Sequence, residues 1–179
     1  KMDTLVTNEQ IEEYYLANPE SFNLNTEIVK AIYIKVPRET PGVENLKIYC
    51  SDNTPAGINT LREKYQKYAK GFDIFLDRWI EFEALSRNIP GVIYNLEEFL
   101  KINDFYEYRD FNFYYLIYIK YYKLKNELAP LDFVEEKIKN LILNRRKIAF
   151  LKQTEESIYT EGLRKKKFKI YNLETNGKK

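Results

Sequence analysis

Apolar and polar residues follow two different periods along the chain, and these periods predict strands as well as helices. Residues 27–36 are rich in β-branched and aromatic side chains and end at Pro37, which is typical of a strand. Residues 112–122 have the same character and predict a second strand. Because side chains of a strand alternate between its two faces, the first strand should turn Ile32, Ile34 and Val36 to one face and Ala31, Tyr33 and Lys35 to the other.

Helix start signals and a spacing of three or four residues predict several short helices. The first begins after Thr7, which forms a capping box with Gln10, and it ends before Pro19. A helix over residues 58–70 is expected to stop at Gly71. Shorter helices are predicted at 46–49, 82–86 and 96–100, the last capped by Asn95.

A much longer helix is predicted over residues 131–163, opened by Pro130. At 1.5 Å per residue it would be about 50 Å long, more than one small domain needs, so we expect it to pack along the N-terminal helix or a partner. Arg145 and Glu155 interrupt its apolar stripe, and a last short strand is predicted at 168–171. The stripe consists of Leu131, Val134, Ile138, Leu141, Ile142, Ile148, Leu151, Ile158 and Leu163.

The composition excludes several classes of enzyme. The chain has 179 residues, a net charge of +2, no histidine and one cysteine. Histidine-dependent catalysis and zinc sites built from histidine or several cysteines are therefore excluded. Carboxylate chemistry and hard-metal sites stay open, but no residue is assigned to a metal. None of the six glycines belongs to a phosphate-binding loop, so we expect no cofactor. The balanced charge gives no reason to expect a nucleic-acid partner, and no apolar run is long enough to span a membrane.

Several segments match one known pattern in order and spacing. Val6–Tyr15 reads Val-Thr-Asn-Glu-Gln-Ile-Glu-Glu-Tyr-Tyr, residues 114–117 read Tyr-Tyr-Leu-Ile, and Ala129–Val134 reads Ala-Pro-Leu-Asp-Phe-Val. Together with the strand at 27–36 and the helix from 58, they resemble, over residues 6–151, the parvulin-type peptidyl-prolyl isomerase domain of SurA- and PrsA-type extracytoplasmic folding factors.

The resemblance, with the order of predicted elements, indicates an α+β protein with a small antiparallel sheet and helices. The parvulin-like domain would span residues 27–128. A helical module would carry it, built from the N-terminal helix in 1–26 and from the long helix and tail in 129–179.

The resemblance also implies a site, with departures from the family pattern. The two family histidines align with Tyr33 and Tyr115, and Asp73 stands for the family's Asp or Cys; these three would be the catalytic residues of an active isomerase. The family's glycine-rich stretch is missing after Asp73. The residues expected to line a peptide slot are Trp79, Phe82 and Phe99. In the alternative interpretation, Tyr33 and Tyr115 are ordinary sheet residues. Asp73 and Asp77, four residues apart, could form a paired-carboxylate site, but no third ligand or base accompanies them, so we expect solvated side chains.

Prolyl isomerisation needs no nucleophile, because its barrier of about 20 kcal/mol is a rotation about a C–N bond. It needs an apolar slot and preorganised hydrogen bonds, so replacement of both histidines predicts weak or lost activity. The expected function is a folding factor that binds unfolded or exported polypeptides, a holdase, in the periplasm or cell envelope, with an export signal outside this sequence. The 16 tyrosines and 11 phenylalanines fit an exposed client-binding surface or simply a large core.

Two other functions remain open on the sequence. One is a working prolyl isomerase with Tyr33 and Tyr115 in place of the histidines. The other is a non-catalytic structural or assembly subunit that docks, or associates with itself, through the helix at 131–163.

Overall fold

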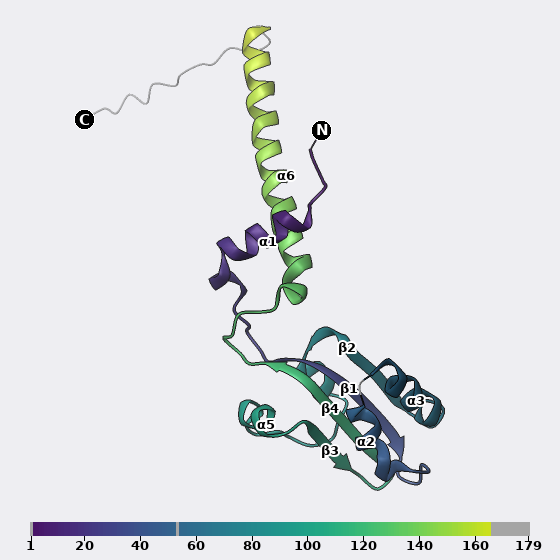
Figure 1. Cartoon of the computed structure of the whole chain (residues 1–179). Coiled ribbons are helices and arrows are strands. Elements are labelled where there is room, and N and C mark those ends of the chain that lie inside the picture. The colour runs from purple at the N-terminus through teal and green to yellow at the C-terminus, as the bar shows by residue number, and fades with distance from the viewer. Residues whose placement is uncertain (1, 53, 166–179) are drawn as a thin grey trace, which may run out of the picture. The chain divides into compact units, whose positions relative to one another are not determined.

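The computed structural model describes residues 2–52 and 54–165, and these include a four-stranded antiparallel sheet (Figure 1). The strands lie in the order β2-β1-β4-β3, and every pair of neighbours is antiparallel. The predicted α+β class is confirmed, as are the strands predicted at 27–36 and 112–122, which are β1 and β4. The strands are β1 (Ile28–Pro37), β2 (Gly71–Glu81), β3 (Phe105–Arg109) and β4 (Phe113–Lys123).

Two of the predicted helix caps, at Thr7 and Asn95, are present in the structure. Gln10 N–H donates to Thr7 Oγ1 at 3.4 Å and Thr7 N–H donates to Gln10 Oε1 at 3.1 Å, which is the predicted capping box. Thr54 and Asn95 cap the third and fifth helices through their side chains. The helices are α1 (Asn8–Ala17), α2 (Leu46–Ser51), α3 (Pro55–Tyr65), α4 (Phe82–Ser86), α5 (Leu96–Ile102) and α6 (Leu131–Arg164), with 3-10 turns at Pro19–Phe22 and Val43–Asn45.

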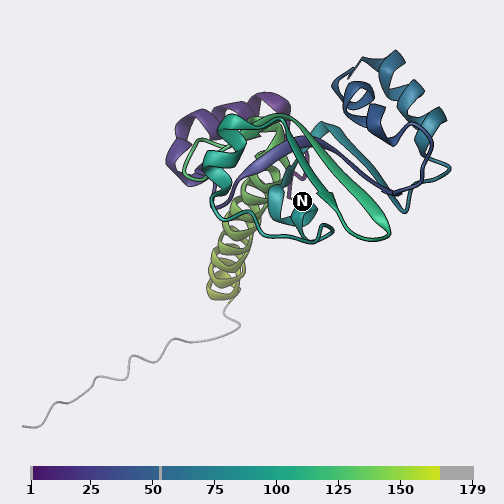
Figure 2. The same cartoon turned by 90° about the horizontal axis from the view of Figure 1, so that it is seen from below.

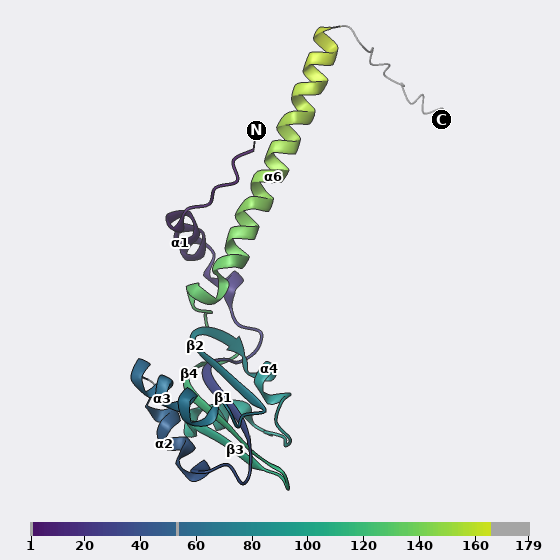
Figure 3. The same cartoon turned by 90° about the vertical axis from the view of Figure 1, so that its right-hand side faces the viewer.

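Strand β1 is buried on both of its faces, and each face has its own helices. Ile32, Ile34 and Val36 pack with residues of α2 and α3, whereas Ala31 and Tyr33 pack with residues of α4 and α5. We call the second side the Tyr33 face. Figure 3 shows α2 and α3 on one side of the strands and α4 on the other. The predicted alternation of β1 is therefore confirmed.

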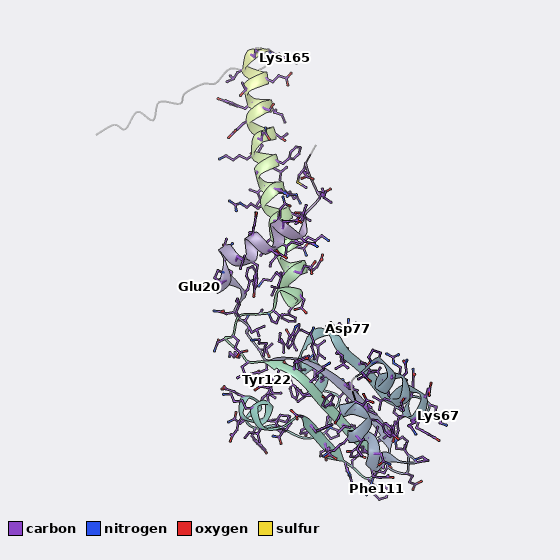
Figure 4. All side chains as sticks on the ribbon, in the orientation of Figure 1. Glu20, Lys67, Asp77, Phe111, Tyr122 and Lys165 are labelled. Atoms are coloured by element: carbon purple, nitrogen blue, oxygen red, sulfur yellow. The ribbon has the colours of Figure 1, made fainter. Side chains whose placement is uncertain are left out.

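Strands β3 and β4 form a hairpin, which Figure 2 shows from below. The Asp110 carboxylate closes its turn by accepting from Asn112 N–H at 2.8 Å and from Phe113 N–H at 2.6 Å. These two bonds to the Asp110 side chain satisfy backbone N–H groups that have no partner strand at a tight turn. Phe111, labelled in Figure 4, lies at the turn with 89% of its surface exposed.

The sequence prediction was wrong about the segment after α3. It extended that helix to residue 70 and made Gly71 its cap, but α3 ends at Tyr65 and Gly71 begins β2. Lys70 N–H donates to the carbonyl of Lys35 at 2.8 Å, so this segment is already paired with β1. β3 was also missed, because a five-residue strand has too few positions to show a period. The strand predicted at 168–171 lies outside the described residues.

The chain divides into two compact units, one of residues 15–134 and one formed by residues 2–14 with 135–165. The first contains the sheet. In the second, Ile11 of α1 and Ile138 of α6 are buried. The Arg146 guanidinium holds the N-terminal segment by donating to Gln10 Oε1 at 2.9 Å and to the Leu5 carbonyl, and it pairs with Asp3 at 3.4 Å. Of the helices described, none combines the length and apolar character needed to cross a membrane.

The contacts of Arg146 predict that Arg146→Ala loosens α1. Hydrogen bonds to a charged group contribute more than neutral ones, so we expect the opening free energy of the α1 amides to fall by about 1–2 kcal/mol. Hydrogen exchange of the amides of residues 11–14 measures this change. Lys147→Ala, at the exposed neighbouring position, is the control and should leave their exchange unchanged. Equal protection in both variants would contradict the role given to Arg146.

Candidate functional site

Three residues that the sequence analysis assigned to catalysis come from three different strands and lie near one another in the sheet. Tyr33 of β1 is paired directly with Asp73 of β2 and with Ile117 of β4. Tyr115 of β4 is paired with Lys35, two residues from Tyr33 along β1. Tyr33 and Tyr115 both belong to the hydrophobic cluster on the Tyr33 face. Diagonal neighbours on one face of an antiparallel pair are within reach of aromatic side chains.

Both tyrosine hydroxyls bond to the chain itself. Tyr33 Oη donates to the backbone carbonyl of Asn88 at 3.2 Å, and Tyr115 Oη donates to Asp110 Oδ2 at 2.8 Å. Only 3% of Tyr33 and 4% of Tyr115 is exposed. A peptide bond therefore reaches neither hydroxyl in this arrangement, since Tyr33 is closed by the segment that contains Asn88 and Tyr115 is bonded to Asp110.

Burial also keeps both phenols protonated. It is the main cause that raises the pKa of Tyr115 to about 12, and the adjacent Asp110 carboxylate adds to the shift. The pKa of Tyr33 is raised by burial first and by the charge of Asp73 second. A tyrosine in this state is a neutral hydrogen-bond donor at neutral pH and cannot act as a general base.

A cation lies at the edge of this pair. Lys35 Nζ is 4.9 Å from the ring centre of Tyr115 and 4.5 Å from that of Phe113, both within the range of cation–π attraction. Although desolvation opposes ionisation of Asp110, hydrogen bonds from Phe113 N–H, Tyr115 and Asn112 N–H hold its pKa below the usual range. The Tyr115 hydroxyl and the Asp110 carboxylate are thus already hydrogen-bonded within the chain.

Beside the tyrosines the structure has a cavity of about 480 Å³. It lies between α4, the segment after α4, the start of α5 and the sheet, and it contains the predicted slot residue Phe82. Apolar side chains make up much of its wall, and charged side chains line it as well. Among these, Arg87 Nη2 and Glu83 Oε1 form an ion pair at 2.8 Å. The apolar lining residues are Phe82, Ile89, Val92, Ile93, Leu96 and Ile117.

The other two predicted slot residues lie apart from the cavity wall. Phe99 of α5 packs edge-on against Tyr106 at 5.8 Å between ring centres, and Tyr106 in turn lines the cavity. Trp79 of β2 lies with Lys30, whose Nζ is 5.2 Å from the centre of the indole ring. Phe82 therefore lines the cavity directly, and Phe99 is connected to it only through Tyr106. Trp79 packs with Lys30 instead.

The sequence analysis missed the segment that shapes the cavity. Residues 87–93 follow α4 and supply Arg87, Ile89, Val92 and Ile93 to its wall. The segment turns at Gly91, whose φ of +119° is strained for any other residue, and a Cβ there would lie 2.5 Å from Tyr106 Oη. The Pro90-Gly91 pair between apolar residues was the available signal, because such pairs place apolar side chains on either side of a turn.

Asp77, the second carboxylate noted in the sequence, does not form a pair with Asp73. Both are exposed and lie four residues apart on strand β2, which separates their Cα atoms by about 13 Å. Within the described residues no group of three or more acidic or cysteine side chains is placed to hold a metal ion. Cys50 of α2 is buried, and this burial raises the pKa of its thiol to about 12, so it is a poor nucleophile.

Comparisons add no relative from which a role for these residues follows. No family model matches the chain, and neither the curated proteins nor the solved structures include a significant match.

The pKa of Tyr115 predicts a loss of stability at high pH. A tyrosine whose pKa is higher in the folded state contributes stability that is complete below about pH 10 and is lost as the pH rises toward about 12. Tyr115→Phe should therefore show a smaller fall in unfolding free energy over this window. Urea unfolding at several pH values measures it, and Tyr94→Phe, at a residue 96% exposed, is the control. Identical slopes for wild type and Tyr115→Phe would contradict the assignment.

Close packing of Tyr33 predicts that Gly71 tolerates no side chain. A Cβ at Gly71 would lie 2.8 Å from Tyr33 Cε1, and this ring has no free space because it is buried. Gly71→Ala should lower the free energy of unfolding by about 1–3 kcal/mol, as overpacked cores do. Urea unfolding measures this, with Lys70→Ala at the exposed adjacent position as the control. Equal stabilities of the two variants would show that the ring moves aside freely.

Proposed function

We propose that this protein is a parvulin-like folding factor that binds unfolded or exported polypeptides and whose isomerase site is weak or lost. One observation carries the proposal. The two tyrosines at the histidine positions are sealed and bonded to their own chain, while an apolar cavity lies beside them on the same face of the sheet.

The order of elements supports the fold part of the proposal. A first strand, helices, further strands and a last long strand follow one another before the long helix, as the resemblance implies. The strand that contains Tyr33 lies beside the one that contains Tyr115, and Asp73 lies opposite Tyr33 on the other side. An envelope location is part of the same proposal and rests on the resemblance alone.

The state of the tyrosines supports the loss of catalysis. Isomerisation is accelerated by groups aimed at the twisted amide, and such groups must face the substrate. Tyr33 and Tyr115 instead direct their hydroxyls to Asn88 and Asp110, and neither residue is among those that line the cavity. Breaking two internal hydrogen bonds on each encounter would cost about 1–3 kcal/mol for each buried group left unsatisfied.

The cavity has properties suited to an apolar side chain of an extended segment. Its volume of about 480 Å³ falls in the usual range of binding pockets, and its wall combines apolar groups with a few polar ones. Glu27, Glu83 and Arg87 present charges of both signs at the wall, so the site has no strong preference for acidic or basic segments. Recognition by apolar character rather than by charge is what a binder of many unfolded chains requires.

A peptide titration tests the proposal. Isotope-labelled protein is titrated with an unstructured Xaa-Pro peptide, with exchange spectroscopy on the peptide. We expect chemical shift changes at residues 82–96 without faster cis/trans exchange. Acceleration at substoichiometric protein would overturn the loss of activity; it would indicate a working isomerase, in which Tyr33→Phe or Tyr115→Phe lowers the rate. Absence of both shifts and acceleration would overturn peptide binding.

A pair of surface variants locates the binding site. Val92 is 70% exposed and lines the cavity, so Val92→Lys places a charge at the cavity without disturbing the core. We expect it to weaken peptide binding about tenfold. Full burial of an unpaired ammonium would weaken binding by more than tenfold, but at this exposed position the amine can turn to solvent. Tyr94→Lys, at a residue 96% exposed and outside the lining, is the matched control. The same two variants should differ in slowing aggregation of an unfolded protein; equal performance would place the binding surface elsewhere.

A further inference from the structure

Helix α6 has an apolar stripe that the described chain leaves largely exposed. In this stripe the side chain of Leu141 is 37% exposed, that of Ile148 69%, that of Leu151 50% and that of Ile158 65%. They recur at intervals of seven, three and seven residues, which keeps them on one side of a helix. Ile138, which precedes Leu141 in the same stripe, is buried, whereas Arg146, which contacts the N-terminal segment, lies about 160° around the helix from Ile148.

The stripe has a symmetric arrangement. Ile148 and Leu151 stand at equal distances on either side of the midpoint between Ala149 and Phe150, and so do Leu141 and Ile158. In an antiparallel helix pair centred on this midpoint, Leu141 packs against Ile158 of the second helix and Ile148 packs against Leu151. Leu141 and Ile148 share one core position of the heptad, and Leu151 and Ile158 share the other. Each residue of one core position then packs against a residue of the other core position, as knobs pack into holes in coiled coils.

The two polar interruptions of the stripe fit the same arrangement. Arg145 and Glu155 lie on opposite sides of the midpoint, within one residue of symmetric placement. One residue is about 1.5 Å along a helix, so the long Arg145 side chain reaches Glu155 of the second copy, and the two-fold symmetry makes this pair twice. Among the residues that the structure describes, neither Arg145 nor Glu155 forms an ion pair within the chain.

We propose that the occupant of this stripe is a second copy of the chain, whose α6 packs antiparallel over residues 141–158. The proposal does not depend on peptide binding at the cavity, because it rests on different residues. The contact would extend over 18 residues, about 27 Å, so the interface is short and the dimer should form in the micromolar range.

A parallel dimer is disfavoured by the same residues. In a parallel pair in register, Glu155 would face Glu155 of the second copy at the centre of the interface. The antiparallel pair turns Glu155 toward Arg145 instead, so the charges as well as the apolar residues select it.

Charge reversal tests this register. Sedimentation equilibrium of the full chain should show a monomer and dimer equilibrium, and Glu155→Arg or Arg145→Glu should raise the dissociation constant about tenfold, since two attractive pairs become repulsive. The double variant Arg145→Glu with Glu155→Arg restores both pairs and should recover the dimer. Glu156→Arg, the same charge change one residue outside the stripe, is the control and should dimerise as the wild type does.

Disulfide trapping tests the direction of the helices. Leu141→Cys and Ile158→Cys proteins, with different tags, should cross-link with each other on oxidation and not each with itself. Cys50 is buried and should stay unreacted. Self-linking of Leu141→Cys would establish a parallel pair and overturn the proposal. A monomer at all concentrations, or a dimer indifferent to the charge reversals, would overturn it as well.

Discussion

Burial of strand β1 on both faces is the constraint on which the sheet unit depends. β1 pairs with β2 on one side and with β4 on the other, and its side chains alternate between the α2 and α3 side and the Tyr33 face. A shift of one residue would exchange these two sets and place Lys35 in a hydrophobic cluster. The register therefore fixes which residues meet Tyr33, and with it the geometry of the candidate site.

At the candidate site both tyrosine hydroxyls are bonded within the chain rather than open to solvent. Tyr33 and Tyr115 occupy adjacent strands as the resemblance implies, but a phenol is longer than an imidazole and its oxygen reaches the chain that covers the sheet. Once bonded to Asn88 and Asp110, the hydroxyls stabilise the closed arrangement. Access to the Tyr33 hydroxyl would require displacement of the segment that contains Asn88, and access to the Tyr115 hydroxyl would require loss of its bond to Asp110.

The sequence predicted best those elements whose signals are local. The capping box of Thr7 and Gln10, the Asn95 cap and the alternation of β1 depend on residues close together in the chain, and all three are confirmed. β2 was not recognised because its residues are mostly half-buried, and the irregular pairing between Val29 and Ala31 interrupts its register with β1. The cavity could not be predicted, because its wall joins Glu27, Phe82 and Ile117, which only the strand order brings together.

The two proposals reinforce each other through the number of binding sites. A single cavity that accepts one apolar side chain gives weak binding, since the area buried must offset the ordering of a flexible segment. A dimer formed through α6 would contain two such cavities, and one unfolded chain has many apolar residues to offer. Occupation of the first cavity makes the second binding event intramolecular, and the gain follows from the local concentration of the tethered segment. Avidity of this kind requires no new contact and no selectivity in either cavity, which is the property that a binder of varied unfolded polypeptides needs.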